Sequence, residues 1–305
     1  MLFKFFNLES SMQQYKVTSD TLNIRSAPIV NDTNLIGVLP KSHIVSKIAN
    51  SDDDKWFKVA TILEGEILEG FVSQKLLSKI TDFPINTLIE IGGISIKQAD
   101  GESAIFYESG MSINADGAPN AYHPADTGID FLANAGNPGN WWAVVVNQNG
   151  NPFIQSSTDP YPGYYISTTA LFDSGFVKHD PRRYVDSTKI PYIVLPGNSE
   201  FTKLTGVKLG DFAVVYNTSN EKLAFAIYAD IGPKNQIGEG SIALSHALGN
   251  DPLIRSRVRR GIPKDIVYVV FPGSGNGQPR TISEIEAETK RLFEIWGGIE
   301  RIKSL

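Results

Sequence analysis

Short apolar runs separated by polar turns dominate the first quarter of the chain. They recur at residues 15–17, 22–24, 35–39, 43–45, 56–59 and 70–72, and polar stretches such as 50–54 lie between them. Runs of this length, rich in Val, Ile, Tyr and Phe, are typical of strands in a small antiparallel barrel. We therefore expect a separate module over residues 15–80. Of its adjacent aromatics, Trp56 and Phe57, we expect one in the core and at most one free to stack on a ligand.

After residue 80, the pattern of apolar and polar residues indicates a linker, then a region of short strands, and finally a helix. Residues 81–95 read as a linker, and short strands with Gly, Pro and Asn loops follow to about residue 275. A helical pattern then runs from Thr281 to Trp296, with hydroxyl side chains suited to cap its start and Gly297-Gly298 to end it. We interpret this helix as a packing or assembly element. The pattern predicts a mainly β protein with a few helices and a second domain over residues 96–305.

The amino-acid composition limits the range of possible functions. Among 305 residues, 41% are hydrophobic, so the chain can bury a core. The net charge of -5 argues weakly against nucleic acid and is compatible with a cationic substrate, although simple solubility is the better explanation of the charge alone. No cysteine is present, which excludes disulfides and thiolate chemistry. The four histidines lack metal-ligand spacing, so we expect neither a metal nor another cofactor.

The first six residues, MLFKFF, form an apolar run that is too short for a secretory signal peptide. No stretch approaches the roughly 20 apolar residues that span a bilayer. We therefore expect no membrane span and find no clear signal peptide.

Two carboxylates carry the most informative chemistry. Apolar runs at 210–216 and 223–229 flank a polar turn and predict a hairpin whose second strand ends on Asp230, before Gly232-Pro233. Glu239 follows nine positions later, ahead of a helix-like run. Paired carboxylates across a turn suit glycoside hydrolysis, where one acts as acid and the other as base. On spacing alone, however, a surface Asx turn at Asp230 and a helix-start acid at Glu239 are the better interpretations.

The surrounding blocks resemble the fungal-type chitosanases of glycoside hydrolase family 75. The likeness covers about residues 100–275, with Asp230 and Glu239 at the family's catalytic positions. It implies an endo-acting, inverting hydrolysis of β-1,4 bonds in chitosan. We assign Glu239 as acid and Asp230 as base, and the reverse assignment stays open. The blocks include DGAPNAYHP (116–124), TGIDFLANAGNPGNWW (127–142), DPYPGYYISTTAL (159–171), RRYVDSTKIPYIVLPG (182–197), GDFAVV (210–215), ADIGPKNQIGEGSIALSHALG (229–249) and VYVVFPGSG (267–275).

A second resemblance covers the first module. LNIRSAP, LIGVLPKSHIV, KWFKVA and GFVSQKLL are similar to a bacterial SH3-like (SH3b) domain, which implies tethering to cell-wall peptides or glycans. The D-x-G-P turn, its loop and the Ser-bearing helix resemble double-psi β-barrel enzymes. We therefore expect an SH3-like barrel followed by a larger six-stranded, double-psi-like catalytic barrel.

Eight further residues are candidates for substrate binding. Acidic ones would pair with the ammonium groups of chitosan, aromatic ones would stack on sugar rings, and Ser241 would orient Glu239. Local structural roles are at least as plausible for most of them: a turn or cap for Asp130 and Asp186, and a loop contact for His123. Only one residue of each aromatic pair can face a cleft. The candidates are Asp116, Tyr122, His123, Asp130, Trp142, Tyr165, Asp186 and Ser241.

Three hypotheses remain after these observations. The first is a chitosanase acting on chitosan or a related amino-sugar polysaccharide, with the SH3-like module binding a cell-wall glycan or peptide. The second is a peptidoglycan-cleaving enzyme on a related barrel, and the third is a carbohydrate-binding protein without activity. By resemblance, we expect the protein to act outside the cell or in the cell envelope. We also expect a monomer and, from the net charge, no binding of nucleic acid.

Overall fold

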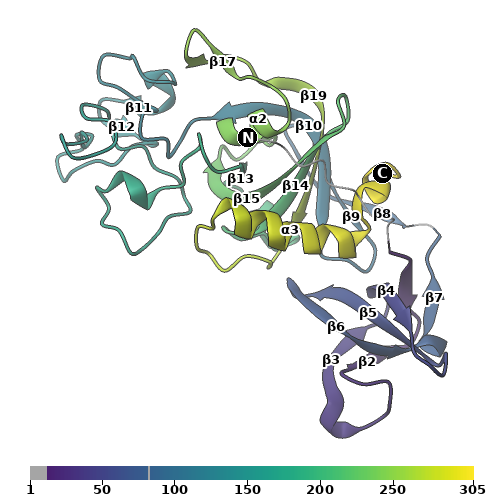
Figure 1. Ribbon diagram of the computed structural model, residues 1–305. Helices are drawn as coiled ribbons and strands as arrows, with labels where there is room; N and C mark the ends of the chain where they lie inside the picture. The colour runs from purple at the N-terminus through teal and green to yellow at the C-terminus, as the bar shows by residue number, and fades with distance from the viewer. Residues whose placement is uncertain (1–11, 82) are drawn as a thin grey trace. The chain divides into compact units, whose positions relative to one another are not determined.

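The structure is a computed structural model that describes residues 12–81 and 83–305. The MLFKFF segment lies outside the described residues. The chain forms two compact units (Figure 1). Of the described residues, the first unit takes in those from 12 to 87 together with 97–105 and 290–305, and the second comprises Leu88–Ile96 and Phe106–Thr289.

The first unit is built on a seven-stranded sheet in the order β3-β2-β6-β5-β4-β1-β7. Its apolar runs form the core because alternate residues of each strand point to one face. Phe57 is a core residue and its neighbour Trp56 is partly exposed, as the alternation of side chains requires. The strands are β1 (Gln14–Val17), β2 (Thr21–Arg25), β3 (Leu35–Pro40), β4 (Ile44–Asn50), β5 (Trp56–Leu63), β6 (Glu66–Ser73) and β7 (Leu77–Lys79), with short 3-10 turns η1 (Asp32–Asn34) and η2 (Gln74–Leu76).

Residues 290–305 belong to this same unit. Helix α3 (Ile282–Trp296) begins where the sequence predicts, because Thr281 and Glu284 cap each other's backbone N–H groups. Gly297, at φ 123°, ends it, and a short helix α4 (Gly298–Ile302) follows. Arg301 of α4 forms a buried, bidentate ion pair with Glu102. Oε2 of Glu102 also accepts a hydrogen bond of 3.1 Å from the indole N–H of Trp296. This pair anchors the chain's end to the 97–105 segment.

The second unit contains the six-stranded barrel that the sequence predicts (Figure 1). The sheet runs β16-β13-β15-β14-β19-β10, and a parallel pairing of β16 with β10 closes it. Pairing is mixed: β13 lies parallel to β15 and antiparallel to β16. The strands are β10 (Ile105–Asn114), β13 (Tyr192–Pro196), β14 (Phe212–Asn217), β15 (Lys222–Gly232), β16 (Glu239–Ser241) and β19 (Ile262–Phe271).

Strands β8 (Ile85–Ile91) and β9 (Ile94–Ala99) extend this sheet beyond β10. The interpretation of residues 81–95 as a linker is therefore wrong for most of that segment. The turn at Gly92-Gly93, with both φ values positive, joins the two strands into a hairpin. Strand pairing satisfies the backbone groups of these residues, which their mixed polar and apolar side chains did not reveal.

The predicted hairpin at 210–229 forms the wall of the barrel. β14 and β15 pair in register from Phe212 with Ile227 to Asn217 with Lys222, and every residue of β14 is buried. Strand β15 continues beyond its pairing with β14 to Gly232, still paired with β13, and Asp230 lies near its end.

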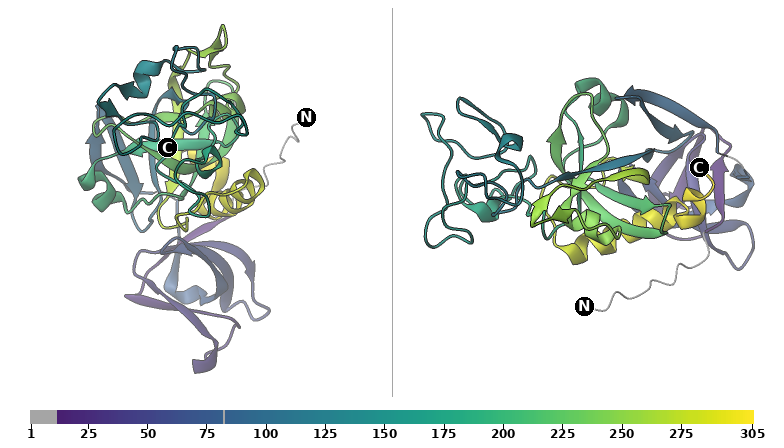
Figure 2. Two further views of the ribbon diagram at one scale, coloured as in Figure 1. Left: turned by 90° about the vertical axis from the view of Figure 1, so that its left-hand side faces the viewer. Right: turned by 90° about the horizontal axis from the view of Figure 1, so that it is seen from above.

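Residues between β10 and β13 form a lobe of loops beside the barrel, drawn in teal (Figure 2). Its regular structure is limited to β11 (Gly136–Asn137), β12 (Asn140–Trp141), 3-10 turns η3 (Leu132–Asn134) and η4 (Pro181–Arg183), and isolated bridges. Arg257 stabilises the lobe, because its guanidinium reaches Asp126 Oδ1 at 2.6 Å and the Asp130 carbonyl at 2.8 Å. Arg257 belongs to a hairpin of β17 (Leu253–Ile254) and β18 (Arg257–Val258); the remaining helices of the unit are α1 (Ser199–Thr205) and α2 (Ile242–Ala247).

The mainly β fold class is thus confirmed, with a closed six-stranded barrel and few helices. Across residues 12–81 and 83–305, none of the helices has the length and apolar character needed to cross a membrane.

Candidate active site

Asp230 lies at the end of β15 with only 9% of its surface exposed. Its Oδ1 accepts a hydrogen bond of 2.8 Å from the backbone N–H of Ala170, a residue of the loop lobe. This bond fixes the carboxyl group between the barrel and the lobe. A backbone donor at one oxygen leaves the other oxygen, Oδ2, to face the remaining polar side chains of the site.

Glu239 enters the same site from β16. The segment 239–241 is a short strand, where the sequence had suggested the start of a helix. The β13–β16 pairing aligns Glu239 with Val194, whose β15 partner is Asp230, so neighbouring strands carry both carboxylates to one end of the barrel. Gly232 lies beside Glu239: a Cβ atom at Gly232 would be 3.4 Å from Glu239 Oε2. A Cβ atom at this position would therefore touch the carboxylate and would press more closely on Val194 Cγ1, at 3.1 Å.

Asn114, at the end of β10, links the two carboxylates. Its Nδ2 lies 3.1 Å from Glu239 Oε1 and 3.5 Å from Asp230 Oδ2. Its Oδ1 accepts from the Asp116 backbone N–H at 2.7 Å and from the Tyr192 hydroxyl at 2.8 Å. Because both donors require an oxygen at that position, the amide orientation is fixed with Nδ2 toward the acids.

Two more carboxylates extend this cluster. Asp116 accepts a 2.7 Å hydrogen bond from the Tyr122 hydroxyl, and Asn114 Nδ2 lies 3.4 Å from its other oxygen. Asp130 is buried and lies 3.4 Å from the same Tyr122 hydroxyl. The two predicted residues Asp116 and Tyr122 thus lie beside the pair, and Asp130 lies one hydrogen bond further out.

Burial dominates the electrostatics of the cluster. It raises the pKa of Asp230 to about 7, against the opposing bonds from backbone N–H groups. Burial likewise raises the pKa of Glu239, with the Asn114 bond acting in the other direction. The pKa of Asp116 is raised well above its ordinary value, first by burial and then by the neighbouring charge of Asp230. A site of this kind holds protonated and ionised carboxyl groups together near neutral pH.

Ser241 has a different role from the one expected. Its hydroxyl caps helix α2 by accepting from the Leu244 N–H at 3.1 Å, accepts from the Tyr192 N–H at 3.0 Å and donates to the Ile190 carbonyl at 2.8 Å. These contacts occupy the hydroxyl, and the expected bond to Glu239 is not among them. Ser241 therefore supports the site by fixing the strand that carries Glu239.

Asp186 and Asp130 make local contacts, as expected if each serves as a turn or cap residue. Asp186 accepts from the N–H and hydroxyl of Thr188 and pairs with Lys189 at 2.8 Å. Asp130 accepts from the Phe131 N–H at 2.7 Å and the Asn134 amide at 2.9 Å. Neither hydrogen-bonds to Asp230 or Glu239.

The aromatic candidates occupy the loop lobe. Trp142 is 58% exposed, with its indole N–H bonded to the Asn134 carbonyl at 2.8 Å. Its neighbour Trp141 packs edge-on against Tyr165, and both lie against the lobe's core. His123 accepts from the Ala125 N–H at 3.1 Å and packs edge-on against Tyr164. Of the predicted aromatics, Trp142 is thus the one with a free ring face, and Tyr165 is largely a packing residue.

Sequence reasoning missed Asn114 and Tyr192. Tyr192 is fully buried, and its hydroxyl lies 2.8 Å from Asn114 Oδ1 and 2.9 Å from the Asp116 carbonyl. The sequence does offer one indication of Asn114: it is a polar residue at the end of the strand that precedes the DGAPNAYHP block. Among the described residues, no group of three or more His, Asp or Glu side chains is arranged to hold a metal ion.

Comparison with known families adds an independent finding. Residues 111–296 match the family described as fungal chitosanase of glycosyl hydrolase group 75. The match spans more than half of the chain and contains Asn114, Asp116, Tyr192, Asp230 and Glu239. It does not extend to the seven-stranded sheet of the first unit. A search of curated proteins returns no match.

Proposed function

The chain belongs to glycosyl hydrolase group 75, the fungal chitosanase family, and is a glycoside hydrolase; on this basis we propose that it cleaves β-1,4 bonds within chitosan chains with Asp230 and Glu239 as its acid–base pair. The observation that carries the proposal is the Asn114 amide, which contacts both carboxylates at 3.5 and 3.1 Å. Two carboxyl groups with raised pKa values at one end of a barrel supply the proton donor and the base that hydrolysis needs.

We assign the acid role to Asp230 and the base role to Glu239, the reverse of our first assignment. Burial holds the pKa of Asp230 at about 7, so this carboxyl group keeps its proton in mildly acidic solution and can donate it to the leaving oxygen. Glu239 is more exposed than Asp230, which suits a group that must activate water. In inversion, ionised Glu239 takes a proton from water as the water oxygen attacks the anomeric carbon, and Asp230 protonates the departing sugar oxygen.

Asn114 acts as a positioning residue in this scheme. Its amide holds the Glu239 carboxylate, and Tyr192 and the Asp116 backbone in turn hold the amide. Fixed donors of this kind reduce the reorganisation that the reaction requires.

The excess of carboxylates also supports a cationic substrate. Asp116 and Asp130 flank the pair, and neither forms a direct ion pair within the cluster described above. An ammonium group on glucosamine would pair with these carboxyl groups in their ionised form and so lower the pKa values that burial raises, whereas the acetamide of chitin would not. We further propose that the protein acts outside the cell or in the envelope, and that residues 15–80 of the first unit form an SH3-like module that binds a wall glycan or peptide.

The test is release of reducing ends from chitosan and from purified peptidoglycan by the full chain. We expect release from chitosan. Release from peptidoglycan alone would contradict the proposal and favour the wall-cleaving alternative. Binding to chitosan without turnover would favour a carbohydrate-binding protein.

A further inference from the structure

The proposed mechanism leaves Asp230 without the proton that it donates, and it leaves Glu239 with the proton that it takes from water. Asp230 must regain a proton before the next turnover. Its carboxyl group has little access to bulk water, since only 9% of the residue is exposed and Oδ1 accepts a 2.8 Å hydrogen bond from the Ala170 N–H. The other oxygen, Oδ2, is therefore the atom that receives the returning proton.

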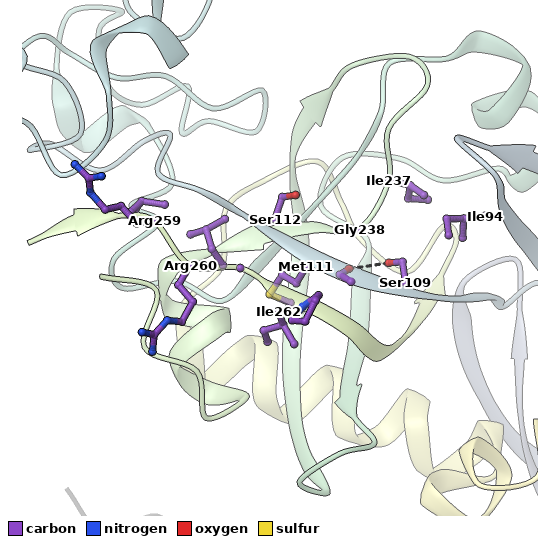
Figure 3. A pocket seen from close by; sticks show the side chains of 14 residues that line it. Ile94, Ser109, Met111, Ser112, Ile237, Gly238, Arg259, Arg260 and Ile262 are labelled. Carbon is purple, nitrogen blue, oxygen red and sulfur yellow. Dashed lines mark hydrogen bonds between the residues drawn. The ribbon is translucent and has the colours of Figure 1, made fainter. Parts of the chain in front are cut away.

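A groove of about 580 Å³ lies between β10 and residues 258–263 (Figure 3). It reaches the strand that carries Glu239, because Gly238 and Ser112 line it and Ser112 pairs with Glu239 in the β10–β16 ladder. Among the described residues, however, those that line the groove include neither Asp230 nor Glu239. The groove therefore offers the Asp230 carboxyl group no direct route to solvent, which leaves the neighbouring carboxyl groups as the nearest proton carriers.

Three carboxyl groups surround the amide nitrogen of Asn114. Nδ2 lies 3.1 Å from Glu239 Oε1, 3.4 Å from Asp116 Oδ2 and 3.5 Å from Asp230 Oδ2. The amide has only two N–H bonds, so it cannot donate to all three oxygens at once. Asp116 Oδ2 is no farther from either of the other two oxygens than the sum of their distances to Nδ2, and within that limit one water molecule can connect them. Asp116 is thus placed to exchange protons with both Glu239 and Asp230.

The Oδ2 atom of Asp116 is the one available for this exchange, because the Tyr122 hydroxyl donates to Oδ1 over 2.7 Å. Burial and then the charge of Asp230 raise the pKa of Asp116 well above its ordinary value; Glu239 and Asp130 act in the same direction, and the Tyr122 bond acts against them. Burial also raises the pKa values of Asp230 and Glu239. A proton can therefore pass among these three carboxyl groups near neutral pH without a large change in free energy.

We propose that Asp116 returns the proton to Asp230 after each turnover, a role that rests on the proposed function. Protonated Glu239 transfers its proton to the ionised Asp116 carboxylate, and Asp116 then transfers a proton to Asp230 Oδ2. Glu239 is thereby ionised, Asp230 is protonated, and Asp116 ends the cycle ionised, as it began. The ammonium group of a bound glucosamine unit favours ionised Asp116 during bond cleavage, and departure of the product restores the affinity of Asp116 for a proton.

The experiment follows cleavage of a saturating glucosamine hexamer by the full-length protein in rapid-quench kinetics, in mildly acidic solution where Asp230 starts protonated. The first turnover needs no returned proton, so in D116N it should stay within about threefold of the wild-type rate, whereas later turnovers should be about 10- to 100-fold slower. D116N should therefore show a burst of product equal to the enzyme concentration. D116E, which keeps a carboxyl group, should show faster later turnovers than D116N. The matched acid-to-amide control D186N lies outside the cluster and should keep the wild-type time course.

Equal slowing of the first and later turnovers in D116N, or later turnovers at the wild-type rate, would overturn the proton-return role. If D116N does not fold, Y122F takes its place. Loss of the Tyr122 bond raises the proton affinity of Asp116 and so slows transfer to Asp230, and Y122F should show the same burst; a time course without one would overturn the role. A wild type that does not cleave the hexamer would instead overturn the proposed function, so the two failures are distinguishable.

Discussion

The Asn114 amide donates to the Glu239 carboxylate over 3.1 Å, although the two residues are 125 positions apart in the chain. The parallel pairing of β10 with β16 brings them together, with Asn114 next to Ser241 and Ser112 next to Glu239 in the register. The strand pair that closes the barrel therefore also builds the site. On the proposed mechanism, closure of the barrel is therefore a condition for activity.

Replacing Asn114 with Ala should lower kcat by about 10- to 100-fold and change KM little, because the amide orients the base without belonging to the substrate's main contacts. The measurement is steady-state kinetics on chitosan. Asn134→Ala is the matched control, since this amide contacts Asp130 and neither member of the pair. An equal decrease in kcat in both variants, or an increase in KM without a decrease in kcat, would contradict a positioning role for Asn114.

The pH dependence of activity should follow the two raised pKa values. Asp230 must keep its proton, so kcat/KM should fall as the pH rises through about 7, the raised pKa of this buried carboxyl group. Glu239 must be ionised to act as the base. Because burial raises its pKa, kcat/KM should start to fall on the acid side at a higher pH than the ordinary pKa of a glutamate would give. A pH–rate profile that stays flat to pH 9 would exclude Asp230 as the acid.

Asp230 should also make stability depend on pH. Its folded-state pKa of about 7 exceeds the ordinary value of 3.8, so its contribution is fully present below pH 3.8 and is lost as the pH rises through 7. Asp230→Asn, which removes the buried charge, should therefore stabilise the protein at pH 8 by about 1–3 kcal/mol and have little effect at pH 4. Chemical denaturation at the two pH values measures this. The exposed Asp251→Asn serves as control, and an equal effect of Asp230→Asn at both pH values would contradict the expectation.

The stereochemistry of the product tests the inverting mechanism. Asp230 Oδ2 and Glu239 Oε1 can be no farther apart than the sum of their distances to Asn114 Nδ2, 3.5 and 3.1 Å. That limit reaches only the lower end of the range of about 6.5–9.5 Å seen in inverting enzymes and also admits the separation of about 5–5.5 Å seen in retaining enzymes, so the expectation of inversion rests on the family resemblance and not on this distance. We expect the α-anomer to form first from the β-linked polymer, as followed by proton NMR. Initial release of the β-anomer would show a double displacement.

The sequence predicted the parts of this site that depend on local pattern or on a family motif. The hairpin of β14 and β15 follows from two apolar runs around a polar turn, and it places Asp230 where the structure has it. Glu239 came from the resemblance, because its spacing from Asp230 resembles that of many surface acids.

Non-local strand pairing explains what the sequence did not predict. Asn114 and Tyr192 meet only because β10 and β13 both pair with β16 in the closed barrel. Ser241 was assigned to Glu239 from proximity in the chain, yet alternation along β16 and the start of α2 direct its hydroxyl to backbone groups instead. Residues 85–91 looked like a linker because their mixed polar and apolar side chains give no clear strand pattern, although β9, the strand that pairs with them, follows directly after the Gly92-Gly93 turn.

The most direct test of the central proposal is the rate of reducing-end release from chitosan by Asp230→Asn and Glu239→Gln, with Asp186→Asn as a matched acid-to-amide control. Each of the first two substitutions should lower kcat by about 10³-fold or more, because it removes a proton donor or acceptor from the reaction. Asp186, which pairs with Lys189 and Thr188, should retain most activity when substituted. Near-normal turnover in either Asp230→Asn or Glu239→Gln, in a folded protein, would contradict the assignment of this pair.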